Sequence, residues 1–213
     1  MTPKCIIFDL DGTLTDSGVG IKNCAKATLA HYRQPIPDEA GLRAIIGPPL
    51  RDSFARLGIP DDKIDEAVAF YRSIYNVTGK FENFPYPGIE ELLQKLKKDG
   101  HRLFVATSKP EGMSVEILEH FGMAHYFEHI CGAAMDGIRD KKAAVIAYLL
   151  GKTGGCENTV MIGDTVFDVQ GASEHNIPTI AVSWGYGDMQ AMKDAGARAA
   201  AHSMEDLYAL LSE

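Results

Sequence analysis

The chain has 213 residues, of which 46% are hydrophobic and 23% charged, and its formal net charge is −8. This composition is typical of a globular protein that buries a sizeable core and has room for a small second module. The acidic balance, without any block of basic residues, argues against binding to nucleic acid or to an anionic membrane surface. We therefore expect neither partner, and a chain with its own core is expected to be a monomer or a weak dimer.

The sequence carries no targeting signal that we recognise. Lys4 precedes a short apolar run that Asp9 interrupts, which is too short for a signal peptide. The longest apolar stretch, around Ala143–Leu150, is far shorter than the roughly 20 residues of a membrane span. The cysteines form no CxxC pair, and we expect buried, reduced thiols at Cys5 and Cys131. Together these features predict a cytoplasmic protein.

The first predicted strand, Cys5–Phe8, is followed by a long helical insert. Between Thr15 and about Asn83 there is no strand signal, and helical patterns occupy residues 18–32, 38–45, 50–57 and 61–77. The segment 84–88, Phe-Pro-Tyr-Pro-Gly, has the composition of a stiff hinge. The sequence therefore predicts an α/β core of residues 1–15 and 84–213, and a small α-helical cap domain of residues 16–83.

Beyond the hinge, short apolar runs alternate with helical patterns. The expected strands are residues 102–106, 130–132, 159–162, 179–182 and, more weakly, 198–200. The expected helices are residues 89–96, 111–121, 142–150, 189–195 and 204–211. Strands of this length that alternate with helices predict a Rossmann-like α/β fold, in which a parallel sheet lies between two helical layers.

Two carboxylates follow the first strand. Asp9 and Asp11 would lie at the carboxyl edge of the sheet, where ligands bind in open parallel sheets. Two residues apart, they could divide the work of a nucleophile or metal ligand and of an acid/base. Gly12 permits a turn whose backbone N–H groups could surround an anion. Taken alone, this motif is equally well explained as an ordinary Asp/Gly turn.

A second acidic pair, Asp164 and Asp168, follows the predicted strand 159–162. Carboxylates that converge at one edge repel each other unless a hard divalent cation lies among them, and a set of oxygen ligands favours Mg²⁺. Both residues could instead cap the next helix. Capping does not explain why the same arrangement occurs twice.

Two further segments could bind a phosphate group. Thr107 and Ser108 follow the strand 102–106 and would present a hydroxyl and backbone N–H groups. Lys141 and Lys142 open the helix after the strand 130–132 and would supply positive charge. Each pattern alone is weak, because such residues are usually caps or solvated surface.

Together, and in this order, these segments resemble the four motifs of the haloacid dehalogenase superfamily, specifically its phosphatases with a helical cap. The first motif is IIFDLDGTLTDS (Ile6–Ser17) and the fourth is MIGDTVFDVQGA (Met161–Ala172). The resemblance implies that Asp9 accepts the phosphoryl group as an aspartyl-phosphate, and that Asp11 is the general acid and then the general base. It further implies Mg²⁺ bound by Asp9, the backbone carbonyl of Asp11 and Asp164, with Asp168 orienting the metal's water shell or Lys142, and phosphate bound by Thr107 and the Ser108 amide.

The third motif departs from one branch of these phosphatases. Phosphoglycolate phosphatases usually carry Lys-Pro-x-Pro, whereas residues 141–146 read KKAAVI, closer to the Lys-x-x-Val-Ile of a 5′-nucleotidase-like branch. This alignment makes Lys142 the catalytic lysine, with Lys141 as the alternative. The Gly-Pro-Pro-Leu loop 47–50 also resembles that branch's cap, which predicts substrate contacts from Gly47, Pro48 and Arg51. A helix breaker between two cap helices explains the loop equally well.

The expected function is Mg²⁺-dependent hydrolysis of a small phosphorylated metabolite. Phosphoglycolate, nucleoside monophosphates and sugar phosphates all stay open as substrates. A phosphomutase of the β-phosphoglucomutase type shares every core residue and is the main alternative. Dehalogenation is disfavoured because Asp11 supplies a proton donor that ester cleavage needs. A phospho-acceptor module resembling a receiver domain is disfavoured by the helical insert.

Overall fold

The structure, a computed structural model, describes residues 3–46, 48, 50–134, 138–154 and 157–212. The chain divides into two compact units, one made of the residues up to Asp16 and from Pro85 on, the other of Ser17–Phe84. Both boundaries lie one residue later than those that the sequence predicts.

The larger unit is built on a six-stranded sheet in the order β5-β4-β1-β6-β7-β8. Neighbouring strands in this sheet all pair in parallel. The strands are β1 (Cys5–Phe8), β4 (Arg102–Pro110), β5 (His129–Ala133), β6 (Thr159–Gly163), β7 (Thr179–Val182) and β8 (Ala199–Ala201). The α/β fold that the sequence predicts is confirmed.

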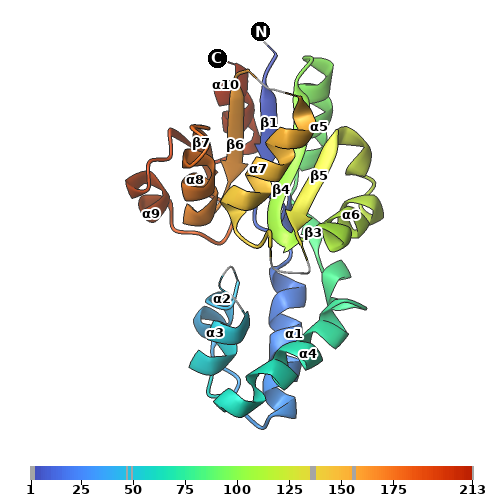
Figure 1. Cartoon of the computed structure of the whole chain (residues 1–213), viewed down its shortest axis with the longest axis vertical. Helices are drawn as coiled ribbons and strands as arrows, with labels where there is room; N and C mark the ends of the chain where they lie inside the picture. Colours follow the sequence, from blue (N-terminus) through green and yellow to red (C-terminus); the bar gives the residue numbers. More distant parts are fainter. Residues whose placement is uncertain (1–2, 47, 49, 135–137, 155–156, 213) are drawn as a thin grey trace. The chain divides into compact units, whose positions relative to one another are not determined.

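Helices cover both faces of this sheet (Figure 1). Successive side chains of a strand point to opposite faces, so Ile6 and Phe8 of β1 pack in one apolar cluster and Ile7 in another. The first face is covered by α5 (Ile89–Lys98), α6 (Glu111–His120) and α10 (Met204–Ser212). The second is covered by α7 (Lys142–Thr153), α8 (Val166–Ser173) and α9 (Met189–Asp194). A short 3₁₀ turn, η3 (Ala124–Tyr126), precedes β5.

Two short strands escape prediction from the sequence. β2 (Thr15–Asp16) and β3 (Phe84–Pro85) pair with each other as a separate two-stranded sheet. Strands of two residues show no alternation, so periodicity does not reveal them. Residues 84–85, expected to be part of a hinge, thus take part in a strand pair where the chain leaves and re-enters the larger unit.

In the described residues of the smaller unit, the regular elements are helical apart from the Phe84 end of β3. Its elements are α1 (Gly18–His31), α2 (Glu39–Arg43), α3 (Leu50–Arg56), η1 (Asp61–Lys63), α4 (Ile64–Tyr75) and η2 (Gly79–Phe81). The apolar side of α4 is largely buried. Tyr71 on this side lies edge-on to Phe54 of α3, with ring centroids 6.0 Å apart, and stacks on Tyr75 at 5.4 Å. These aromatic contacts fix α3 and α4 together within the unit.

One prediction about the cysteines is wrong. Cys5 takes part in a disulfide bond rather than being a reduced thiol. Cys24 and Cys131 are free and buried, and burial raises the pKa of both thiols to about 11. Among the helices of the described residues, none combines the length and the apolar character that crossing a membrane requires.

Candidate active site at the carboxyl edge of the sheet

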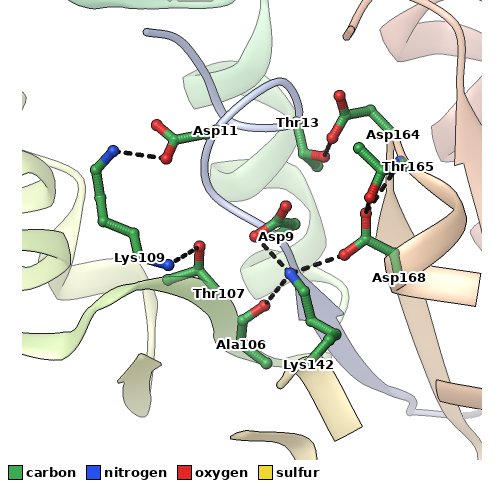
Figure 2. A network of polar contacts seen from close by, with 10 residues as sticks. All are labelled: Asp9, Asp11, Thr13, Ala106, Thr107, Lys109, Lys142, Asp164, Thr165 and Asp168. Carbon is green, nitrogen blue, oxygen red and sulfur yellow. Dashed lines mark hydrogen bonds and ion pairs between the residues drawn. The ribbon is translucent and has the colours of Figure 1, made fainter. Parts of the chain in front are cut away.

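The candidate site lies where the central strands β1, β4 and β6 end. β1 runs between the other two, with Phe8 paired to Val105 on one side and to Ile162 on the other. The next residue, Asp9, donates its backbone N–H to the Ile162 carbonyl oxygen at 2.9 Å, which continues the sheet by one residue. Asp9 and the residues after Ile162 therefore emerge at one edge, as Figure 2 shows.

Lys142 lies at the centre of the site. Its Nζ is 2.7 Å from Asp9 Oδ1 and 2.7 Å from Asp168 Oδ1, and it donates to the Ala106 carbonyl oxygen at 3.0 Å. The side chain is only 4% exposed. Burial lowers the pKa of Lys142, but Asp168 and Asp9 outweigh burial and hold the pKa above its ordinary value. Lys142 is therefore a buried cation, whereas Lys141 precedes α7 and is exposed.

Asp9 itself is nearly buried. Burial raises the pKa of its carboxyl from the ordinary 3.8 to about 6, against the opposing effect of Lys142. Asp168 and Asp11 contribute to this rise because like charges repel. An ionised Asp9 is thus stabilised mainly by one contact, its ion pair with Lys142.

Asp164, which follows β6, is fully buried among polar groups. Its Oδ1 accepts from the Thr13 hydroxyl at 3.2 Å and its Oδ2 accepts from the Tyr186 backbone N–H at 2.8 Å. Burial, together with Asp168 and Asp9, raises the pKa of Asp164 to about 8. Near neutral pH this carboxyl holds a proton unless another positive charge lies beside it.

Asp168 has two structural tasks at once. Its Oδ2 accepts from the Thr165 backbone N–H at 3.0 Å and from the Thr165 hydroxyl at 2.8 Å, which makes a capping box at the start of α8. Its Oδ1 pairs with Lys142. Asp168 therefore caps α8 with one oxygen and orients Lys142 with the other.

The carboxylates of Asp9, Asp164 and Asp168 could hold a metal ion, because one oxygen of each lies within 4.8 Å of the others. All three are buried, and Lys142 is the cation that contacts two of them. Three negative charges against one positive charge, in a donor set made only of oxygen, suit a hard divalent cation. Asp168 uses one oxygen for the helix cap and the other for Lys142, whereas Lys142 contacts one oxygen of Asp9 and neither oxygen of Asp164, so Asp9 and Asp164 are the better candidates for direct ligands.

Asp11 turns away from these three carboxylates. Its Oδ2 lies 2.6 Å from the Nζ of Lys109, a side chain only 6% exposed at the end of β4 (Figure 2). Reasoning from the sequence missed this pair, because Lys109 reads there only as a residue after the Thr-Ser motif. The signal that could have revealed it is its place in the chain, since Lys109 lies near the carboxyl end of β4, which runs parallel to β1 and beside it.

A second segment that sequence reasoning undervalued is the loop after β7. The Trp184 indole N–H donates to the Thr13 carbonyl oxygen at 3.1 Å, and the Tyr186 N–H contacts Asp164 as described above. A Cβ on Gly185 would overlap the Asp164 carboxylate and the Gly12 carbonyl oxygen. Gly12, at φ +81°, likewise has space only for hydrogen against Asp164. The loop after β7 therefore holds the Asp164 carboxylate in place.

We expect Gly185→Ala to weaken divalent-cation binding by about 10- to 100-fold, the usual cost of displacing groups that orient a metal ligand. The added methyl group has no space beside Asp164, so the carboxylate must move. Titration of the purified protein with Mn²⁺ by calorimetry measures the affinity. Gly112→Ala is the matched control, because a Cβ there meets nothing within 4 Å. Unchanged affinity in Gly185→Ala would contradict the assignment of Asp164 as a ligand.

The remaining residues that the sequence predicts for the site lie either at the end of β4 or in the helical unit. Thr107, 2% exposed at the end of β4, accepts the Lys109 backbone N–H at its Oγ1, at 3.3 Å, and Ser108 is exposed. Pro48 and Arg51 belong to the helical unit, where Arg51 pairs with Asp65. Gly47 lies outside the described residues. Substrate contacts from these three cap residues stay a prediction.

The fold and the site define a Rossmann-like α/β enzyme core with an acidic site at the carboxyl edge of its central strands. The sequence profile described as haloacid dehalogenase-like hydrolase matches residues 6–182. The chain belongs to this family of hydrolases, which confirms the resemblance in the sequence motifs.

Three known proteins are similar over most of this chain. The tyrosine-protein kinase PtkA of Mycobacterium tuberculosis is 42% identical over 187 residues, which cover 87% of this chain but only 64% of PtkA. A 5′-nucleotidase of Pseudomonas aeruginosa is 41% identical over 207 residues, covering 96% of this chain and 92% of that enzyme. The crystal structure of a predicted phosphatase from Clostridium acetobutylicum superposes with a TM-score of 0.90 at 38% identity, covering 99% of both chains.

Proposed function

We propose that the protein is a Mg²⁺-dependent phosphatase that hydrolyses a small phosphomonoester through an aspartyl-phosphate on Asp9. The observation that carries the proposal is the buried Asp9 carboxylate, held by Lys142 at 2.7 Å, with a second carboxylate, Asp11, two residues further along the same loop. Membership of the hydrolase family and 41% identity to a 5′-nucleotidase support it.

In the proposed first step, an oxygen of Asp9 attacks phosphorus while the bond between phosphorus and the ester oxygen breaks. Asp11 gives its proton to that departing oxygen, so the alcohol leaves neutral. In the second step water attacks phosphorus, Asp11 takes the proton back from the water, and the bond to Asp9 breaks. One water is consumed and one inorganic phosphate is released for each ester, and both carboxyl groups return to their starting states.

Positive charge makes the attack feasible, because a carboxylate and a phosphate dianion repel each other. Mg²⁺, held by Asp9, Asp164 and the carbonyl oxygen of Asp11, would supply charge neutralisation to the nucleophile and to the phosphoryl oxygens. Lys142 orients Asp9 through its ion pair with Oδ1. Thr107 and the Ser108 N–H are proposed to bind the phosphoryl oxygens. Once the charges are neutralised, the main task of these groups is to hold the phosphoryl group in line with Asp9.

Nucleoside 5′-monophosphates are the substrate class that we expect first. The name of the Pseudomonas relative and the KKAAVI segment at residues 141–146 point in the same direction. The test is a panel of phosphorylated metabolites with Mg²⁺, ranked by kcat/KM, that includes nucleoside 5′-monophosphates, phosphoglycolate and hexose phosphates. Phosphate release that is fastest from the nucleotides supports the proposal. A preference for phosphoglycolate would overturn the substrate class but not the reaction.

Two other activities give different products in the same panel. A phosphomutase would accumulate a hexose bisphosphate and an isomerised hexose phosphate, with little free phosphate. A kinase, the activity that the name PtkA indicates, would transfer phosphate from ATP to a protein tyrosine. Either result, in the absence of phosphate release from monoesters, would overturn the phosphatase proposal.

Removal of the metal is expected to make stability depend on pH. The pKa of Asp164 is about 8 in the folded protein and near 3.8 when unfolded, so the folded state binds a proton that the unfolded state has lost. This contribution to stability is present below about pH 4 and is lost as pH rises toward 8. We expect the EDTA-treated protein to lose on the order of 5 kcal/mol of unfolding free energy across this range, since each pKa unit corresponds to about 1.4 kcal/mol, measured by urea denaturation at several pH values.

Asp164→Asn and added Mg²⁺ test the origin of this loss. The amide does not titrate, so the variant should show a flatter pH dependence than the wild type in EDTA. Mg²⁺ should stabilise the wild type most at pH 8, where its ligands are ionised, and should stabilise the variant little. Equal stabilisation of both proteins by Mg²⁺ would contradict the proposed site.

A further inference from the structure

We propose that Lys109 is a positioning residue for Asp11, holding its carboxyl group in the orientation from which it exchanges a proton with the departing alcohol and with water. The inference rests on the proposed phosphatase function and adds to it a residue that acts through Asp11 rather than on the phosphate. Asp11 and Lys109 both belong to the larger unit of the chain.

Lys109 is buried and contacts a residue of the candidate site. Its side chain is 6% exposed, and its Nζ lies 2.6 Å from Asp11 Oδ2. An ammonium group removed from water is costly unless it is paired with a negative charge. A lysine on a solvated surface would not keep its ammonium group this close to one carboxylate, so the ion pair with Asp11 requires a structural or functional explanation.

The backbone around Lys109 directs the side chain. β4 continues as far as Pro110, but its register with β5 shifts between Ala106 and Pro110. Within this irregular segment the Lys109 N–H donates to the Thr107 hydroxyl oxygen at 3.3 Å. The local hydrogen bond sets where the lysine leaves the strand, and its side chain reaches Asp11 from there (Figure 2).

The two oxygens of Asp11 are in different situations. Oδ2 is held by Lys109, while Oδ1 is buried and has no hydrogen-bond partner among the described residues. A group that gives up and takes back a proton needs one oxygen free to meet the substrate and a fixed orientation for that oxygen. The contact of the Lys109 ammonium with Oδ2 supplies the fixed orientation and leaves Oδ1 available to carry the exchanged proton.

The same contact keeps Asp11 apart from the other carboxylates. In Figure 2, Asp11 and Lys109 lie on one side of the loop that follows β1, and Asp164 and Asp168 lie on the other. If Asp11 turned toward them, a fourth carboxylate would join three that are already crowded. Lys109 thus keeps the proton-exchanging carboxyl group of Asp11 separate from the carboxylates that are proposed to bind the metal.

The experiment compares two esters that differ in their need for a proton. p-Nitrophenyl phosphate releases a stable anion that leaves without protonation, whereas phenyl phosphate depends more on the acid. Lys109→Met removes the ammonium and keeps an unbranched side chain. We expect it to lose about 100-fold in kcat/KM with phenyl phosphate but less than about 5-fold with p-nitrophenyl phosphate, since general acid catalysis contributes factors of this size.

Two further variants complete the comparison. Lys109→Arg retains the charge and the donors, so it should recover most of the activity on phenyl phosphate. Lys98→Met, at an exposed position near the end of α5, should leave both esters at wild-type rates. Crystal structures of the wild type and of Lys109→Met provide a readout that is independent of activity, because the Asp11 carboxyl group should change its orientation when the lysine is lost.

The outcomes separate the inference from the function on which it rests. An equal loss on both esters, with a raised KM, would mean that Lys109 binds the substrate and would overturn the positioning role. An unchanged Asp11 orientation in Lys109→Met would overturn it as well. If the wild-type protein hydrolyses neither ester nor any metabolite of the panel, the phosphatase function itself fails.

Discussion

Asp9→Asn is expected to reduce phosphate release by at least about 10³-fold, because the amide has the shape of the carboxylate but no nucleophilic charge. The loss should appear for every phosphomonoester, since the nucleophile is needed whatever alcohol leaves. Steady-state release of inorganic phosphate at saturating Mg²⁺ measures it. The same loss on p-nitrophenyl phosphate and on a nucleotide distinguishes this residue from Lys109.

The variant is also expected to fold. Burial raises the pKa of Asp9 to about 6, which means that the folded protein destabilises the charged carboxylate. The neutral amide of asparagine avoids this destabilisation. Lys142 keeps Asp168 and the Ala106 carbonyl oxygen as partners. The thermal unfolding temperature in EDTA should therefore stay within a few degrees of the wild type.

Asp62→Asn is the matched control, because Asp62 is exposed in the turn before α4 and should leave turnover unchanged. Undiminished activity in Asp9→Asn would end the assignment of Asp9 as the nucleophile. An equal fall in both variants would mean that the assay follows general damage to the protein rather than the chemistry.

The larger features of the fold follow from the sequence because they depend on patterns repeated over several residues. The strand Cys5–Phe8 is buried on both faces, so it reads as one continuous apolar run, and the helix Ile89–Lys98 repeats its apolar positions at helical spacing. The strand pair of residues 15–16 and 84–85 has no such repetition. The disulfide at Cys5 depends on tertiary proximity, which spacing along the chain does not report.

The acidic part of the site could be predicted for a similar reason. Asp9 and Asp164 each follow a buried strand, and the ends of parallel strands meet at one edge of the sheet. The groups that hold Asp11 and Asp164 in place could not be predicted. Lys109 reaches Asp11 from a strand irregularity, and Tyr186 reaches Asp164 from a loop through its backbone N–H, which any residue but proline provides.

Lys142→Met is expected to damage both stability and activity, since Lys142 is the cation that Asp9 and Asp168 share. Removing one partner of a buried ion pair leaves the other charges uncompensated and typically costs about 3–5 kcal/mol. Part of this cost is avoided because Asp9, whose pKa is already raised, can take up a proton. A protonated Asp9 is a poor nucleophile, so we expect turnover to fall by at least about 10²-fold even where the variant is folded.

Lys141→Met provides the control that the chain itself offers. Lys141 is adjacent in sequence but exposed, and its removal should change neither the unfolding temperature nor kcat/KM by more than about 2-fold, as is usual for surface positions. Measuring both variants at pH 6 and pH 8 separates the two effects, because protonation of Asp9 relieves the destabilisation at the lower pH. A larger loss in Lys141→Met than in Lys142→Met would show that the third motif is misaligned by one residue.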